Sequence, residues 1–203
     1  FNSIALRGNI QNFENSDISL YLGSNFHFVI YPINQNNEFN FISIVRKKLV
    51  GSEITNRSLF KDKIFINNLM SQISSKSDLN LSELVNEIKC FPIFVSKKIK
   101  IPRNKNIFLM GDAFFSFPPS FAQGASQSIE SANDLFNDLN NNLSNYYKKR
   151  VLKTKQINSR SSINHYAFHI ANPINVFFRN IFLKYLSKNK SFLENYLGKI
   201  YKN

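Results

Sequence analysis

Residues 108–136 read FLMGDAFFSFPPSFAQGASQSIESANDLF and carry the strongest structural signal in the chain. The 203 residues contain only six glycines and six prolines, yet two of each fall between Gly111 and Gly124. An apolar run precedes the Gly-Asp pair, and apolar residues recur with helical spacing after the second glycine. This order predicts a buried strand, a turn containing two prolines, and a helix that begins near Ala125.

The chemistry of this turn suits a ligand. In layered α/β proteins, ligands bind beyond the carboxyl ends of strands. A glycine such as Gly111 lets the backbone approach a ligand closely, and Asp112 can accept hydrogen bonds from sugar-like hydroxyls. The helix start offers free N–H groups and about half a unit of positive charge. We therefore expect a polyhydroxylated ligand on Asp112, with an electron-rich group over the helix start. The alternative is an ordinary connection in which Asp112 caps a helix.

Residues 1–50 are predicted to form strands in SIALRGNI, HFVIYPI and FNFISIVRK, with NQNNE as the hairpin loop between the last two. Period-2 alternation along FHFVIYP puts His27, Val29 and Tyr31 on one face of the sheet. The other face, with Phe26, Phe28 and Ile30, is the expected core side. His27 and Tyr31 would then either line a pocket or face solvent.

The remaining segments alternate between helix and strand patterns. Residues 56–89 are predicted to form two helices, the second marked by an apolar stripe of Leu81, Leu84, Val85 and Ile88. CFPIFVSKKI predicts an edge strand or strand start at Pro92, and NKNIFLM a buried strand. Residues 143–203 look helical and basic, after a polar turn in NDLNNNLSN. Within them, INVFFRNIFLKYL either lies on a membrane surface or packs on the rest of the protein.

Composition narrows the choice of function classes. The net charge of +13 fits either an anionic partner or a codon bias that favours Lys and Asn, and the cations form no stripe typical of nucleic-acid binding. The one cysteine, Cys90, excludes an internal disulfide and is expected in the core. His165 and His169 are spaced to share a helix face, but no acid accompanies them, so no metal site is expected. No apolar stretch is long enough to span a membrane, and no signal peptide follows Phe1.

IFLMGDAFFSFPPSFAQGASQSIESANDL resembles the second flavin-binding motif of the FAD-dependent aromatic hydroxylases, the class A flavoprotein monooxygenases. The residues that match without a gap are Gly111, Asp112, Ala113, Pro119, Gln123 and Gly124. ALRGNI, YLGSNFHFVIYPI, FNFISIV and YYKKR are similar to further segments of salicylate-hydroxylase-like members, as is the helix containing Arg179-Asn180. The resemblance covers nearly all of the chain.

This resemblance implies cofactor contacts for the Gly-Asp segment. Asp112, beside Gly111, would bind the ribityl chain of the flavin or its neighbouring hydroxyls. Pro119 would lie close to the flavin ring and shape the pocket above it. After Gln123, the backbone N–H groups of Gly124, Ala125 and Ser126 would face the pyrimidine edge of the isoalloxazine, where the helix dipole stabilises the negative charge of the reduced flavin.

The resemblance also implies a substrate side and a reaction. His27 and Tyr31 would point toward the substrate ring, and Arg7 would lie near the flavin. FAD reduced by NAD(P)H would react with O2, and the resulting flavin hydroperoxide would hydroxylate an aromatic or quinone-precursor substrate. Pro119 joins His27 and Tyr31 as an expected active-site residue. The expected location is the cytoplasm, with peripheral membrane contact through the C-terminal helices.

The implied fold is α/β, with α+β character in this part of the protein. We expect a substrate-binding sheet with covering helices in residues 1–100, the second part of the FAD-binding domain in 101–142, and a C-terminal helical region in 143–203. No Gly-x-Gly-x-x-Gly unit is present, so the N-terminal segment that holds the ADP half of FAD is expected elsewhere in the same protein. The chain alone should bind FAD weakly.

Three positions depart from the family pattern. Phe115 replaces its usual His, Ser126 its usual Asn, and Ser131 its usual acid, although Glu130 is adjacent. Two other hypotheses therefore stay open. One is a catalytically degraded flavoprotein of the same fold. The other is a basic, non-enzymatic protein that binds an acidic partner or a membrane surface.

Overall fold

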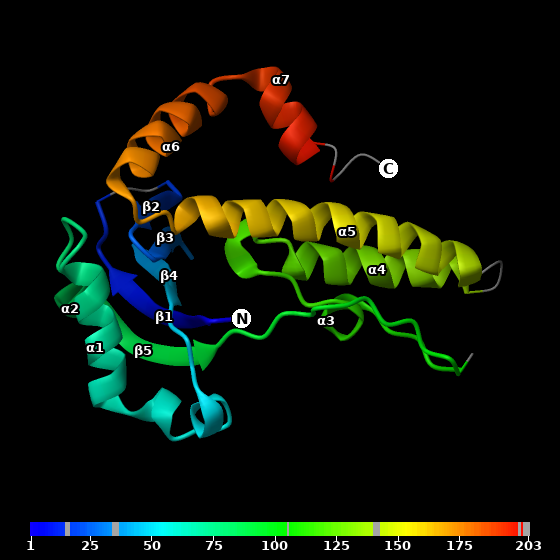
Figure 1. Cartoon of the computed structure of the whole chain (residues 1–203), viewed down its shortest axis with the longest axis horizontal. Helices are drawn as coiled ribbons and strands as arrows, with labels where there is room; N and C mark the ends of the chain where they lie inside the picture. Colours follow the sequence, from blue (N-terminus) through cyan, green and yellow to red (C-terminus); the bar gives the residue numbers. More distant parts are fainter. Residues whose placement is uncertain (15–16, 34–36, 105, 140–142, 199, 201–203) are drawn as a thin grey trace. The chain divides into compact units, whose positions relative to one another are not determined.

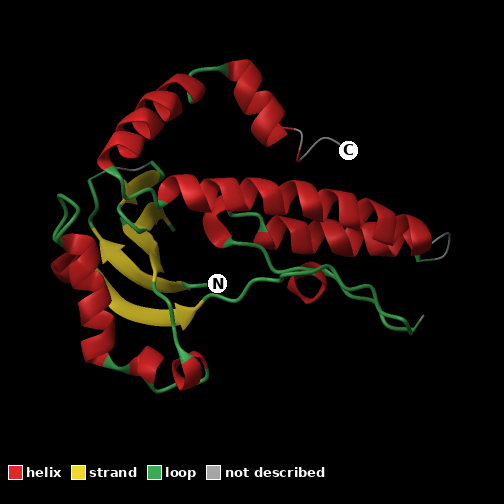
Figure 2. Cartoon of the chain, in the orientation of Figure 1, coloured by secondary structure: helices red, strands yellow, loops and turns green. Residues whose placement is uncertain are grey.

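The computed structural model describes residues 1–14, 17–33, 37–104, 106–139, 143–198 and 200 (Figure 1). They form two compact units. The first comprises Phe1–Ile93 with Phe168–Pro173, and the second comprises Phe94–Ala167 with Ile174–Asn203. The prediction of a mixed α/β fold with a sheet and covering helices is confirmed (Figure 2).

The first unit is built on a five-stranded antiparallel sheet with the strand order β2-β3-β4-β1-β5. In chain order, its strands are β1 (Ser3–Gln11), β2 (Ser19–Gly23), β3 (Phe26–Pro32), β4 (Glu38–Arg46) and β5 (Val85–Pro92). The predicted pairing of β3 with β4 is confirmed, while residues 34–36 of the expected NQNNE loop lie outside the described residues. Sequence analysis missed β2, which is joined to β3 through a tight turn at Asn25, whose φ is +67°.

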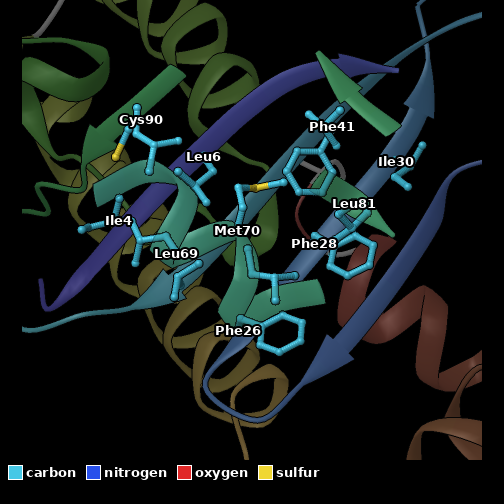
Figure 3. Close-up of a cluster of buried hydrophobic side chains, with 14 of the residues drawn as sticks. Ile4, Leu6, Phe26, Phe28, Ile30, Phe41, Leu69, Met70, Leu81 and Cys90 are labelled. Carbon is cyan, nitrogen blue, oxygen red and sulfur yellow. The ribbon is translucent and has the colours of Figure 1, made fainter. Parts of the chain in front are cut away.

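Helix α1 (Lys63–Ser74) packs on one face of this sheet. Asp62 caps the helix by accepting a hydrogen bond from the Phe65 N–H at 2.9 Å. The i, i+3, i+4, i+7 spacing then directs four apolar side chains inward, namely Ile66, Leu69, Met70 and Ile73. They meet the side chains of β1, β3 and β4 in one buried cluster (Figure 3). The predicted core face of β3, which carries Phe26, Phe28 and Ile30, is confirmed, as is a buried Cys90.

The predicted second helix is largely wrong. Two short 3-10 turns, η1 (Gly51–Ile54) and η2 (Leu59–Lys61), precede α1. After α1, the apolar stripe that begins at Leu81 forms only the short helix α2 (Leu81–Leu84). From Val85 onward the chain forms β5, because β1 has an open edge whose backbone groups β5 satisfies. Two residues of β5 oppose Gly8 at a bulge, where a Cβ on Gly8 would lie 2.7 Å from the Asn86 carbonyl oxygen.

Two strand predictions near the middle of the chain also need correction. In CFPIFVSKKI only Cys90–Pro92 is strand, because Pro92 already pairs with Ile4 near the start of β1 and the ladder partner runs out. Pro92 does lie on an edge strand, as predicted. In NKNIFLM, the described residues form no strand, and Ile107 and Met110 are about half exposed. The second unit has no described strand with which this segment could pair.

The second unit is helical. Its elements begin with α3 (Gly111–Phe114), the 3-10 turn η3 (Pro119–Phe121) and α4 (Gly124–Asp138). They continue with α5 (Leu143–Phe168), α6 (Pro173–Leu186), α7 (Lys190–Leu193) and a π-helical turn, η4 (Glu194–Gly198). The predicted start of α4 and the helical character of residues 143–198 are confirmed. Residues 140–142 of the expected turn in NDLNNNLSN lie outside the described residues. In the part of the chain that the structure describes, no helix combines the length and hydrophobicity needed to cross a bilayer.

Candidate functional site

Polar side chains cross three neighbouring strands on the sheet face opposite the core. Arg7 of β1 donates through Nε to Asn40 Oδ1 of β4 at 3.3 Å. Asn40 in turn donates through Nδ2 to the Tyr31 hydroxyl of β3 at 2.5 Å. The pairing register brings Tyr31 opposite Asn40, and Asn40 is almost fully buried. This hydrogen-bonded chain fixes the position of the Tyr31 hydroxyl.

His27 lies on the same face of β3 and is also buried. Its Nδ1 lies 2.9 Å from the Nε2 of His169, so one imidazole donates and the other accepts. The ring of Phe168 meets His27 edge-on, with the ring centroids 5.2 Å apart. The structure therefore brings His27 and Tyr31 onto one face, as alternation along β3 predicts, and holds both in fixed orientations.

In the second unit, the Gly-Asp pair opens α3 with an unusual backbone conformation. Gly111 has a φ of +54°, and its N–H donates to the Ser131 hydroxyl at 2.9 Å. A Cβ at Gly111 would lie 2.6 Å from the Oγ of Ser128. Ser131 is buried and also donates to the Ser128 carbonyl oxygen. Ser131, which stands where the flavin-binding motif usually has an acid, therefore holds the turn at Gly111 against α4.

Asp112 is exposed in the first turn of α3. Among the described residues, its carboxylate has no hydrogen-bond or ion-pair partner. Pro119 is likewise exposed and begins η3, and Ala122 closes that turn with a left-handed φ of +51°. A non-glycine residue in this conformation is strained, and such strain concentrates at ligand sites.

The start of α4 is open. Gln123 precedes the helix and is buried. The first-turn N–H groups of Gly124, Ala125 and Ser126 have no acceptor among the described residues. No atom lies within 4 Å of the position that a Cβ on Gly124 would take. These amides and the helix dipole make this end of α4 suited to an electron-rich group.

A buried guanidinium that sequence analysis missed joins α4 to α5. Arg150 is 2% exposed. It donates to Gln127 Oε1 at 2.8 Å and lies 3.4 Å from Glu130 Oε1 and 3.3 Å from Asp134 Oδ2. The signal for it was present in the sequence, because Glu130 and Asp134 are spaced to share one face of α4. This network leaves the apolar side chains Ile129 and Phe136 on the exposed side of the helix.

Of the other residues singled out from the sequence, His169 bonds the site residue His27, while Phe115 and His165 have other contacts. Phe115 is buried beside Phe117, with ring centroids 5.1 Å apart. His165 and His169 do not share a helix face, because α5 ends at Phe168. His165 instead bonds Ser120, with 3.1 Å between Nδ1 and Oγ, whereas His169 bonds His27 in the first unit.

The chain shares its fold with parts of several proteins of known structure. HpxO of Klebsiella pneumoniae, complexed with FAD and uric acid, is 13% identical, with a TM-score of 0.76 over 98% of this chain and 53% of that chain. The tetracycline destructase Tet(55) is 14% identical, with a TM-score of 0.64 over 96% of this chain and 53% of its own. A salicylate hydroxylase in complex with its substrate is 13% identical, with a TM-score of 0.64 over 92% and 53% of the two chains.

The chain spans about half the length of these structures. No protein-family profile and no curated protein sequence matches it. At this level of identity, the likeness establishes the fold alone, which this chain shares with part of each of these proteins.

Proposed function

We propose that this chain is the C-terminal portion of an FAD-dependent monooxygenase that hydroxylates an aromatic or quinone-precursor substrate, with NAD(P)H as the reductant. The observation that carries the proposal is the turn from Gly111 to Ser126. It combines an exposed carboxylate, two glycines and the open start of α4 in the order of a flavin-binding motif. The flavin, when bound, supplies the oxygen activation and the hydroxyl transfer.

The proposed flavin contacts follow from the chemistry of the turn. Asp112 has no partner among the described residues and would accept hydrogen bonds from the ribityl hydroxyls. The amides of Gly124, Ala125 and Ser126 would stabilise negative charge on the pyrimidine edge of the reduced ring. Gly111 and Gln123 would shape the backbone around them, and the exposed Pro119 would limit the space above the ring.

The polar sheet face is the proposed substrate side. The fixed Tyr31 hydroxyl and the His27 imidazole would orient an aromatic ring that carries polar groups. The bonded Arg7 adds a positive charge near Tyr31. Of the proteins with the same fold, one is in complex with uric acid and another is a salicylate hydroxylase in complex with its substrate. Both support the proposal of a small aromatic substrate.

A further segment of the same protein would complete the cofactor site. It would hold the ADP half of FAD on a Gly-x-Gly-x-x-Gly unit. The exposed Ile129 and Phe136 of α4, and the extended segment from Ile107 to Met110, are surfaces that it would cover. In this proposal, residues 1–100 form the substrate-binding domain, 101–142 part of the FAD-binding domain, and 143–203 a C-terminal helical region. The proposed location is the cytoplasm, where NAD(P)H would be available as the reductant.

Flavin titration tests the proposal. We expect the fluorescence of FAD to change when the chain is added. The dissociation constant should lie above the submicromolar range, because the proposed ADP site is not part of this chain. Asp112→Ala should weaken this binding about tenfold through loss of charge-assisted hydrogen bonds. Asp78→Ala, which removes an exposed aspartate of the sheet unit, is the matched control and should bind as the unchanged chain does.

Three results would count against the proposal. Submicromolar binding by the chain alone would remove the need for a second segment. Equal losses in the Asp112 and Asp78 variants would show that the turn does not hold the flavin. A complete protein that binds flavin but oxidises no NAD(P)H with any aromatic substrate tested would favour the hypothesis of a catalytically degraded flavoprotein.

A further inference from the structure

One side of α6 exposes an unbroken apolar surface, which we call the outer face. The i, i+3, i+4, i+7, i+8, i+11 spacing places its members along one side of the helix. Each is between 53% and 67% exposed, and they are Ile174, Phe177, Phe178, Ile181, Phe182 and Tyr185. Six large apolar side chains gathered on one helix face are more than the scattered apolar residues that any protein surface carries.

The opposite side of α6 is the one that the protein covers. Arg179 is buried there and donates through Nη1 to the Ala167 carbonyl oxygen at 3.4 Å. The side chains of Val176, Leu183 and Leu186 on that side are half-buried. Burial lowers the pKa of Arg179, but its hydrogen bonds to Ala167 and Asn180 provide partners for the guanidinium. Helix α6 therefore packs on the protein through one apolar side and exposes a second apolar side, the outer face.

The charges around this face have one sign. Between Asp138 and Glu194 the chain contains no acidic residue and ten basic residues. Three of them, Lys184, Lys188 and Lys190, lie in α6 or directly after it. None of these three pairs with a carboxylate among the described residues. Whatever covers the outer face must accept apolar side chains and carry negative charge.

We propose that the outer face of α6 docks on the surface of an anionic lipid membrane. The helix would lie in the interface, with its phenylalanines at the boundary of the acyl chains and its lysines extended toward lipid phosphates. A second copy of this chain fits poorly, because two surfaces with only positive charges repel each other. This docking does not depend on the proposed flavin chemistry.

Vesicle sedimentation tests the docking directly. The chain should bind vesicles of phosphatidylcholine with about a quarter phosphatidylglycerol, and bind pure phosphatidylcholine far less. Phe178→Ser combined with Phe182→Ser should weaken binding by roughly ten- to a hundredfold, because two exposed rings lose their burial in lipid. Lys184→Gln combined with Lys188→Gln should weaken binding to the anionic vesicles by about fivefold for each lysine. All four side chains are exposed, so the fold should survive both changes.

The matched control is Phe136→Ser combined with Ile129→Ser, which removes two exposed apolar side chains from α4. It should bind anionic vesicles as the unchanged chain does. Equal losses in the α4 and α6 variants, equal binding to the two kinds of vesicle, or no binding to either would overturn the proposal. So would a dimer in sedimentation equilibrium that the Phe178 and Phe182 changes abolish, because it would assign the outer face to a second copy.

Discussion

Two glycines bracket the proposed flavin turn, and they are there for different reasons. Gly111 needs its missing side chain for the fold, because its φ is +54° and Ser128 occupies the space of a Cβ. Gly124 has open space around it and a helical conformation. A glycine that the fold does not require is better explained by a ligand that approaches the backbone.

Alanine substitution separates these two roles. Gly111→Ala should lower the free energy of unfolding by about 1–2 kcal/mol, because an L residue is disfavoured at this φ. Gly124→Ala should leave stability unchanged or raise it by up to about 1 kcal/mol, since alanine is the better helix former. It should nevertheless weaken FAD binding, because its methyl group would stand beside the amides proposed to face the ring.

Urea unfolding of both variants, monitored by circular dichroism, measures the change in stability. Flavin titration of both variants measures the change in FAD affinity. A Gly124→Ala variant as unstable as Gly111→Ala would show that the start of α4 is constrained by packing. Unchanged flavin affinity in a stable Gly124→Ala variant would argue against a flavin close to this end of the helix.

At the scale of elements, α4 and α5 are joined by charges where most helix pairs use apolar side chains. Arg150 is buried, while its partners Glu130 and Asp134 keep 27% and 22% of their side-chain surface. Removing the guanidinium would leave Asp134 without an ion-pair partner among the described residues, whereas Glu130 keeps Lys153 at 3.1 Å. This loss of a partner is costly even where the pair itself contributes little net stability.

Arg150→Gln should therefore lower the free energy of unfolding by about 2–4 kcal/mol. Lys149→Gln is the control from the same helix, because Lys149 pairs with Asp138 at 3.3 Å but is 58% exposed. It should cost less than about 1 kcal/mol, as exposed ion pairs generally do. Chemical denaturation of the two variants measures the difference, and similar costs would mean that Arg150 is not the link between the helices.

The elements also show what can be read from the sequence. Alternation along FHFVIYP placed the core face of β3 correctly, and the position of Gly124 placed the start of α4. Helical spacing failed for Val85 and Ile88, because the open edge of β1 recruits them into a bulged strand that local periodicity cannot reveal. The apolar run before Met110 has strand composition, but a strand needs a neighbour, and the described part of its unit offers none.

The candidate site was predictable to a similar degree. The residues of the Gly-Asp turn and the orientation of His27 and Tyr31 follow from local patterns, and each set lies within one of the two units. The contributions of Asn40, Ser131 and His169 were not predictable, nor was the identity of Arg150 as the partner of Glu130 and Asp134. Each acts through a partner distant in sequence, and the distance between such residues is set only by the fold.

At the scale of the whole molecule, each unit buries an acidic group in its neutral form. Burial raises the pKa of the Cys90 thiol in the first unit to about 12 and that of the Tyr146 phenol in the second to about 12. In the unfolded chain these groups ionise near about 8.5 and about 10. The folded state therefore holds more protons in this range, and stability present at neutral pH should fall as pH rises above about 9 toward 12.

The urea midpoint between about pH 8 and about pH 11.5 measures this loss. Tyr146→Phe should flatten the alkaline decline, at the cost of the hydrogen bond from its hydroxyl to the Leu109 carbonyl oxygen at 2.8 Å. Cys90→Ala should flatten it as well, since it removes the thiol. If the urea midpoint of the variant with both changes fell as steeply with pH as that of the unchanged chain, other groups would be responsible for the loss.

The bond between His27 and His169 joins side chains 142 residues apart in the sequence. On a ribosome, the apolar core of the sheet unit, which runs from Ile4 to Cys90, is available long before His169 emerges. The nascent sheet can therefore collapse early, while its polar face still lacks a side chain that is synthesised much later. Until then, the bond between His27 and His169 cannot form, and the apolar core of the sheet is in place before its polar face is complete.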